Sequence, residues 1–123
     1  MNNAICWFEI PVADMDRAQR FYEAVLGAPT RREAMLGQEL AVLPYEHGAG
    51  VGGALLRGGP FTPSDQGTVP YLPVAPSVAA ALERAVAAGG TVTLSPVALP
   101  GEMGVYAHVL DTEGNRVGLH AAR

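Results

Sequence analysis

The sequence predicts one α+β domain built from two similar halves, and three observations carry this prediction. The segment WFEIPV at residues 7–12 is echoed by VPYLPV at residues 69–74, which lies 62 positions later. Each segment is followed by a helical pattern that ends at a glycine, Gly27 or Gly89, and these two glycines are again 62 apart. The rest of each half contains short strand patterns separated by turn residues. The repeat therefore predicts two modules with the order strand–helix–strand–strand–strand.

The length and composition of the chain indicate a single domain. Its 123 residues, 49% of them hydrophobic, can form one buried core. We expect a single domain over 1–123, with module one at about 1–56, a linker at about 57–68 and module two at about 69–123. No apolar stretch reaches membrane-spanning length, the N-terminus lacks a secretory pattern, and Cys6 is the only cysteine. These features favour a cytoplasmic protein without a membrane partner.

The charge pattern excludes several classes of protein. A net charge of −4 with scattered arginines argues against nucleic acid as a partner. The absence of lysine excludes Schiff-base chemistry and lysine-dependent phosphate loops, and it suggests a GC-rich bacterial genome. Residues 48–53, GAGVGG, match a dinucleotide-binding pattern, but the helix that this motif needs does not follow. No serine stands in a nucleophile-elbow motif.

Two segments, 14–26 and 77–88, have the apolar spacing of amphipathic helices. Asp14 and Ser77 are suitable N-cap residues, because their side chains can accept hydrogen bonds from the first helical turn. The residues that we expect on the buried helix faces are Met15, Ala18, Phe21, Tyr22, Val25 and Leu26 in the first helix and Val78, Leu82, Ala85 and Val86 in the second.

Six further strands complete the two modules. They are expected at residues 30–36, 38–45, 51–56, 91–95, 104–110 and 115–121. The segment DTEGN, residues 111–115, is expected to form the hairpin turn before the last strand. The linker contains two prolines and three glycines, which favour an irregular connection between the modules.

Two motifs, FYEAVLG at 21–27 and DTEGNRVGL at 111–119, occur together with the paired modules. In this combination the chain resembles the vicinal oxygen chelate superfamily, which includes glyoxalase I, extradiol dioxygenases and bleomycin resistance proteins. The resemblance covers essentially the whole chain. It implies an open, partly closed eight-stranded barrel with a central cavity between the sheets, and it implies a homodimer.

The resemblance also implies where a metal would bind. Members of this superfamily normally hold a divalent ion through His, Gln or Glu side chains on the first and last strands of each module. The corresponding positions here are Trp7, Gly53, Val69 and Gly118, none of which can ligate a metal through its side chain. We therefore expect no metal and no cofactor at the usual site.

Strand alternation predicts which side chains face the cavity. Phe8, Ile10 and Val12 should pack beneath the helices, which turns Trp7 and Glu9 to the opposite face. The same reasoning applies to the 62-residue repeat and to the later strands. The residues expected to bind a ligand are Trp7, Glu9, Tyr71, Tyr106, His108 and His120.

Structural roles remain open for several of these residues. Glu9 could pair with an arginine, His108 could be a hydrogen-bonded core residue, and His120 could simply be solvated. Cys6 is expected on the core face, where it would act as a packing residue.

Two classes of function follow from this pattern. The first is a metal-free protein that binds or sequesters a small organic molecule, which the aromatic cavity and the vacant ligand positions favour. The second is an enzyme. It could be a metal-independent isomerase or lyase with Glu9 as general base and His108 or His120 as acid. It could also be a metal-dependent lyase or dioxygenase whose displaced site uses Glu9 and the histidines.

Overall fold

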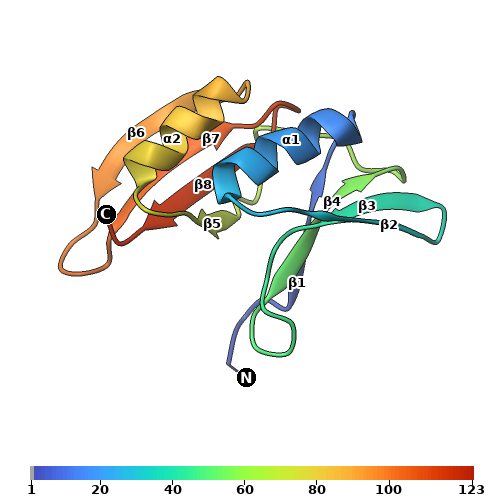
Figure 1. Ribbon diagram of the computed structural model, residues 1–123, viewed down its shortest axis with the longest axis horizontal. Helices are drawn as coiled ribbons and strands as arrows, with labels where there is room; N and C mark the ends of the chain where they lie inside the picture. Colours follow the sequence, from blue (N-terminus) through green and yellow to red (C-terminus); the bar gives the residue numbers. More distant parts are fainter. Residues whose placement is uncertain (1) are drawn as a thin grey trace.

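The computed structural model describes residues 2–123 and confirms the predicted α+β class, with two helices and two four-stranded sheets (Figure 1). The strands of sheet A lie in the order β1 (Trp7–Pro11), β4 (Gly52–Arg57), β3 (Gln38–Val42) and β2 (Arg31–Met35). The strands of sheet B lie in the order β5 (Tyr71–Pro73), β8 (Arg116–Ala121), β7 (Val105–Leu110) and β6 (Thr91–Ala98). In each sheet the first and last strands of the module pair in parallel, and the other pairs are antiparallel. The two modules therefore share one topology.

The helices are α1 (Met15–Leu26) and α2 (Val78–Ala87). Asp14 caps α1, because its side chain accepts a hydrogen bond from the Arg17 N–H, and Ser77 caps α2 in the same way. Gly27 ends α1 in the left-handed conformation at φ 70°, which a residue without a Cβ adopts at no steric cost. Neither of these helices is long and apolar enough to cross a membrane.

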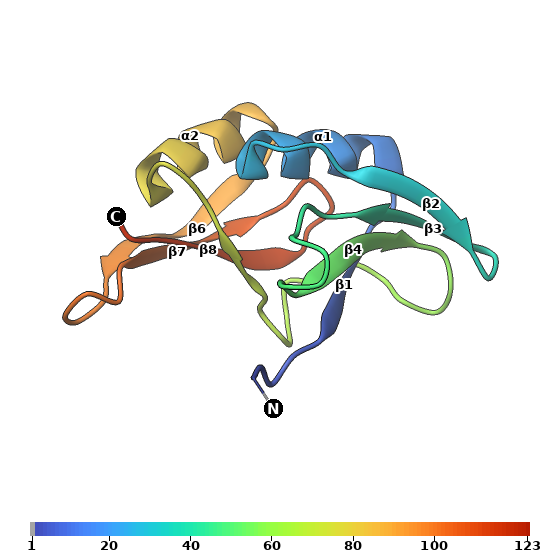
Figure 2. The same ribbon diagram turned by 60° about the horizontal axis from the view of Figure 1, so that its bottom comes forward.

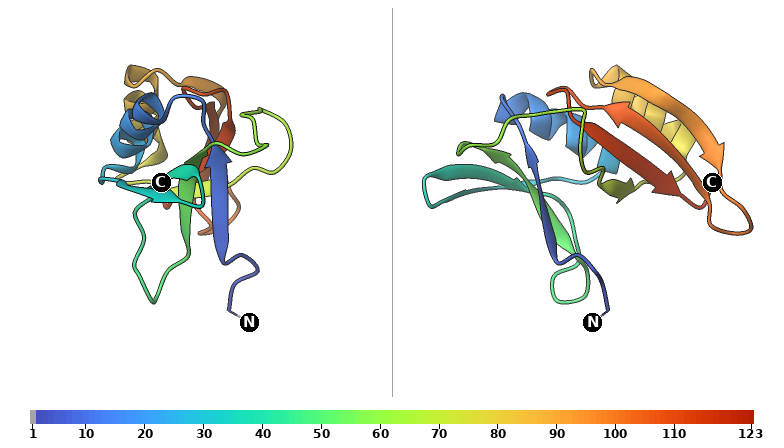
Figure 3. Two further views of the ribbon diagram at one scale, coloured as in Figure 1. Left: turned by 90° about the vertical axis from the view of Figure 1, so that its right-hand side faces the viewer. Right: turned by 180° about the vertical axis from the view of Figure 1, so that it is seen from behind.

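The two sheets lie side by side, and both helices cover the same side of them (Figure 2). Helix α1 contacts β4 and α2, whereas α2 contacts β6, β7 and β8. The sheet faces on the other side are open, and seen from behind they do not close into a complete barrel (Figure 3). The edge strands β1 and β5 line the space between the two modules.

The core lies between the helices and the covered sheet faces. The buried residues of α1 are Met15, Ala18, Phe21, Tyr22 and Val25, all of them predicted, whereas Leu26, which was also predicted, is only partly buried. The buried residues of α2 are Val78, Ala81, Leu82 and Ala85. On β1 the predicted alternation is also present, since Ile10 is buried while Trp7 and Glu9 are exposed.

Three local predictions are corrected by the structure. Val86 is 55% exposed, because it lies about 80° around the helix axis from Val78, beyond the stripe that contacts the sheet. Cys6 is exposed and not a packing residue, since β1 begins only at Trp7. Strand β6 continues past the predicted end to Ala98. It includes Pro96, which an edge strand with register shifts can accommodate.

The DTEGN turn ties module two to module one through the buried carboxylate of Asp111. The Tyr22 hydroxyl of α1 donates to Asp111 Oδ2 at 2.5 Å, and Asn115 Nδ2 donates to the same oxygen at 3.0 Å. Asp111 Oδ1 accepts from the backbone N–H groups of Glu113 and Asn115, both at 2.8 Å. Asn115 Nδ2 also donates to the Pro11 carbonyl at 2.7 Å. The two motifs that stand out in the sequence thus meet in the core.

Glu113 makes the second connection from the same turn, at the start of α1. Its Oε1 accepts from the backbone N–H groups of Ala13 at 2.9 Å and Asp14 at 2.8 Å. Arg17 adds an ion pair at 2.7 Å, and the Glu113 side chain is fully buried. Burial raises the pKa of this carboxyl, but the hydrogen bonds from Arg17, Asp14, Thr112 and Ala13 outweigh burial and lower the pKa to about 2.

Arg84 joins the two helices. Its guanidinium donates to the carbonyl oxygens of Ala24 at 2.9 Å and Val25 at 2.8 Å, at the end of α1. It also donates to the Ala75 carbonyl at 2.9 Å. A positive charge at a helix C-terminus is favourable because the last carbonyl groups lack intrahelical partners.

Candidate functional site

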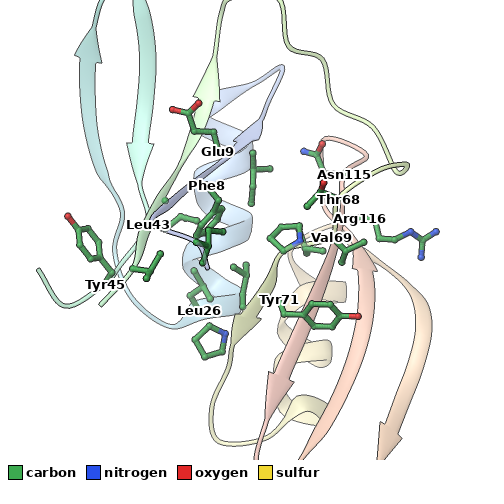
Figure 4. A pocket seen from close by; sticks show the side chains of 18 of the residues that line it. Phe8, Glu9, Leu26, Leu43, Tyr45, Thr68, Val69, Tyr71, Asn115 and Arg116 are labelled. Carbon is green, nitrogen blue, oxygen red and sulfur yellow. The ribbon is translucent and has the colours of Figure 1, made fainter. Parts of the chain in front are cut away.

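A cavity of about 870 Å³ lies between the two modules (Figure 4). One wall comes from β1 and the segment after β3, and the other comes from the segment that leads into β5 and from the start of β8. Leu26, at the end of α1, lies between the walls. The lining is mostly apolar with a few polar groups, which is the composition of a small-molecule site.

The sheet A wall contains Phe8, Leu43, Tyr45 and Glu9. Phe8 packs over Gly53, whose missing side chain leaves room for the aromatic ring. Glu9 accepts one long hydrogen bond, 3.4 Å from Trp7 Nε1, and no ion pair of Glu9 occurs within residues 2–123. The expected alternative, pairing with an arginine, is therefore not what the structure shows.

The sheet B wall contains Val69, Tyr71, Asn115 and Arg116. The Tyr71 ring and the Arg116 side chain extend away from Phe8, over sheet B (Figure 4). Tyr71 pairs with Gly118 on β8, so both residues share the open face of this sheet.

An aromatic and imidazole cluster continues from Tyr71 across the open face of sheet B. The Tyr71 hydroxyl lies 2.7 Å from His108 Nε2, and Tyr106 packs against both rings at centroid distances of 5.9 Å. Burial, together with the positive charge of Arg116, lowers the pKa of His108 below its ordinary value. The imidazole is thus neutral at neutral pH and offers one donor and one acceptor nitrogen.

Of the six predicted site residues, four lie in the cavity lining or beside it, and two, His120 and Trp7, lie outside it. Glu9 and Tyr71 line the cavity, and Tyr71 brings Tyr106 and His108 into contact at its edge. His120 shares the open face of sheet B, but its Nε2 lies 2.7 Å from the Met103 carbonyl oxygen, in the loop before β7.

Trp7 is not among the residues that line the cavity. It contacts Tyr45 edge to face, at a centroid distance of 6.4 Å, on the open side of sheet A.

Arg116 and Tyr45 are among the cavity residues that were not predicted from the sequence. Arg116 stands two residues before Gly118 on β8, so the alternation that placed His120 on the open face would also have placed Arg116 there. Tyr45 belongs to the irregular segment after β3, whose path the sequence pattern does not fix.

The residues at the expected metal positions do not fit a metal. None of the four carries a donor side chain, and no group of three or more His, Cys, Asp or Glu side chains gathers within residues 2–123. At Gly118, an added Cβ would lie 2.3 Å from the Tyr71 ring, so this ring fills the space that a ligating side chain would use.

The metal position expected at Gly53, on the last strand of module one, also needs a correction. Gly53 pairs with Phe8 on the covered face, and Ala54 is the β4 residue that pairs with Glu9. The equivalent of Gly118 in module one is therefore Ala54, which has no donor side chain either.

Two modules of this topology around a shared cavity define a paired-βαβββ protein. The chain matches the family model of the Glyoxalase/Bleomycin resistance protein/Dioxygenase superfamily over residues 4–119. It therefore belongs to this superfamily, as the sequence motifs suggest. Among curated proteins, none matches the chain.

Solved structures show the same fold. Glyoxalase I from Zea mays is 21% identical with a TM-score of 0.70, and the match covers 95% of this chain and 45% of that one. A glyoxalase/bleomycin resistance protein from Albidiferax ferrireducens T118 is 20% identical with a TM-score of 0.69, covering 97% and 98%. Another from Streptomyces sp. CB03234 is 25% identical with a TM-score of 0.67, covering 93% and 96%. The chain thus spans less than half of the maize enzyme.

Proposed function

We propose that this protein binds a small organic molecule in the cavity between its modules, without a metal. The observation that carries the proposal is the cavity itself. Its volume of about 870 Å³ lies in the range of sites for drug-sized ligands, roughly 300–1,000 Å³. Phe8, Leu43 and Val69 provide apolar surface, and Glu9 and Tyr71 provide polar groups that can orient a ligand.

Binding is favoured over catalysis because the expected general acids, His108 and His120, do not line the cavity together with Glu9, the expected general base. Glu9 lines the cavity from sheet A, whereas His108 and His120 lie on sheet B outside the lining. His108 is engaged with Tyr71, and His120 with the Met103 carbonyl. A general acid and a general base must both reach the reacting atoms, which this arrangement does not support.

A variant that fills the cavity tests the proposal. We expect Val69→Trp to lose any small molecule that co-purifies with the wild-type protein, because the indole would occupy the space between the walls. The matched control is Val86→Trp, which makes the same change on an exposed part of α2. Untargeted mass spectrometry of extracts from the three purified proteins gives the readout. A set of bound compounds that is unchanged in Val69→Trp would contradict the proposal.

We further propose that the chain acts as one domain and assembles as a homodimer in the bacterial cytoplasm. The contacts of Asp111 and Glu113 with module one support the single domain. Large apolar side chains on the open side support the dimer, since Trp7 is 39% and Tyr71 is 51% exposed. Sedimentation equilibrium should give twice the chain mass at micromolar concentration, and a monomer mass at all concentrations would refute the dimer.

A further inference from the structure

Arg116 lines the sheet B end of the cavity, and its positively charged guanidinium extends from there over sheet B (Figure 4). It reaches from β8 towards β6, where Nη1 donates to Thr93 Oγ1 at 3.0 Å, and Nε donates to the Asp65 carbonyl at 3.3 Å. Within residues 2–123, no Asp or Glu oxygen lies within 4.0 Å of its nitrogens. A guanidinium has five N–H donors, so both hydrogens on Nη2 and one on Nη1 remain available.

Tyr71 supplies a second donor on the same sheet face. Its ring lies over Gly118, and its hydroxyl is 2.7 Å from His108 Nε2. When the neutral imidazole carries its proton on Nε2, it donates to the phenol oxygen, and the phenol hydrogen is then free for a ligand oxygen. A negative charge beside the phenol favours this tautomer.

We propose that Tyr71, His108 and Arg116 form a binding site for the carboxylate of an organic monoanion. Nη1 and Nη2 of Arg116 form a planar fork, which suits the two carboxylate oxygens. The inference rests on the proposed function, since the apolar body of the ligand lies in the cavity between Phe8 and Val69.

The opposite wall limits the ligand to one negative charge. Glu9 lines the same cavity from sheet A and has no cationic partner within residues 2–123. A second anionic group at that end would meet a like charge, whereas a neutral or hydrogen-bond-donating end would not. The ligand class is therefore an amphipathic monocarboxylate.

Two probes of the same shape test this inference, 2-naphthoate and its neutral amide, 2-naphthamide. Calorimetric titration of the purified protein should show that 2-naphthoate binds at least tenfold more tightly than 2-naphthamide. Arg116→Gln should weaken 2-naphthoate by about 10- to 100-fold, as expected for a lost charge-assisted hydrogen bond, and should change 2-naphthamide by less than threefold. Tyr71→Phe should weaken 2-naphthoate by about 3- to 10-fold.

The control is Arg20→Gln, which removes the same charge from an exposed position of α1. Arg20 forms no ion pair within residues 2–123. Circular dichroism of each variant checks that the fold is retained. Equal affinity of wild-type protein for both probes, or an Arg116→Gln variant with wild-type affinity for 2-naphthoate, would overturn the anion site. If Val69→Trp still abolished binding of both probes, the proposed cavity function would stand. Failure of both probes to bind at millimolar concentration would overturn both the anion site and the proposed cavity function.

Discussion

Asp111→Ala should lower the free energy of unfolding by about 3–5 kcal/mol, the largest effect of any single polar substitution that we expect in this protein. The carboxylate accepts four hydrogen bonds, and two of their donors, Tyr22 and Asn115, are buried side chains. Alanine cannot accept any of them, so the Tyr22 hydroxyl and the turn N–H groups lose their partner in a place that water does not reach. Urea unfolding followed by circular dichroism measures this change.

Two further variants separate the loss of the network from a general effect of the substitution. Tyr22→Phe removes a single hydrogen bond and leaves the other three, so it should cost only about 1–2 kcal/mol. Asp65→Ala makes the same change as Asp111→Ala in the exposed linker and should stay within about 0.5 kcal/mol of wild type. If Asp111→Ala were no more destabilising than Asp65→Ala, the turn would not hold the two modules together.

The fold was predictable because its signals are local and occur twice. Asp14 and Gly27 mark the ends of α1, and the apolar spacing between them identifies the buried face. Repetition of the same order after 62 residues made the paired topology a strong inference, which the sheets confirm. Val86 was assigned wrongly because periodicity indicates the direction of the buried stripe but not its width.

The candidate site was less predictable, because it depends on how two sheets sit relative to each other. Strand alternation correctly separated Glu9 from Ile10, since this property belongs to one strand. Strand alternation does not show how two sheets are placed relative to each other. In the structure the open sheet faces lie side by side, so His120 lies outside the cavity that Glu9 lines. The contact of Tyr71 with His108 joins two strands that are 37 residues apart and depends on tertiary packing.

The DTEGN motif is a second case in which the sequence predicts local structure but not tertiary contacts. In the sequence it predicts a hairpin turn, and the structure adds that its two acidic side chains bind module one. Asp111 and Glu113 are therefore acidic residues with a structural role. A motif that identifies the family is, in this chain, a motif that joins its two modules.

Glu113 should make the stability of the protein depend on pH in the acidic range. Its pKa is about 2 in the folded protein and near 4.5 as an ordinary glutamate, so the unfolded chain binds the proton more tightly. The contribution of the carboxylate is therefore fully present above about pH 4.5 and is lost as the pH falls towards 2. At about 1.4 kcal/mol per pKa unit, this difference corresponds to about 3.5 kcal/mol at neutral pH.

The comparison of wild type with Glu113→Gln isolates this contribution from the other carboxylates. The glutamine is uncharged, and it keeps only one acceptor oxygen, because an NH2 donor replaces the other. It can therefore not accept all of the hydrogen bonds that Glu113 accepts from Arg17 and from the N–H groups of Ala13 and Asp14. The variant should be less stable by about 2–3 kcal/mol at pH 7, and the two unfolding free energies should converge as the pH approaches 2. Glu83→Gln, on the exposed face of α2, should follow the wild-type curve at every pH. A constant difference between wild type and Glu113→Gln from pH 7 to pH 2 would mean that the ionised carboxylate is not what holds the turn against α1.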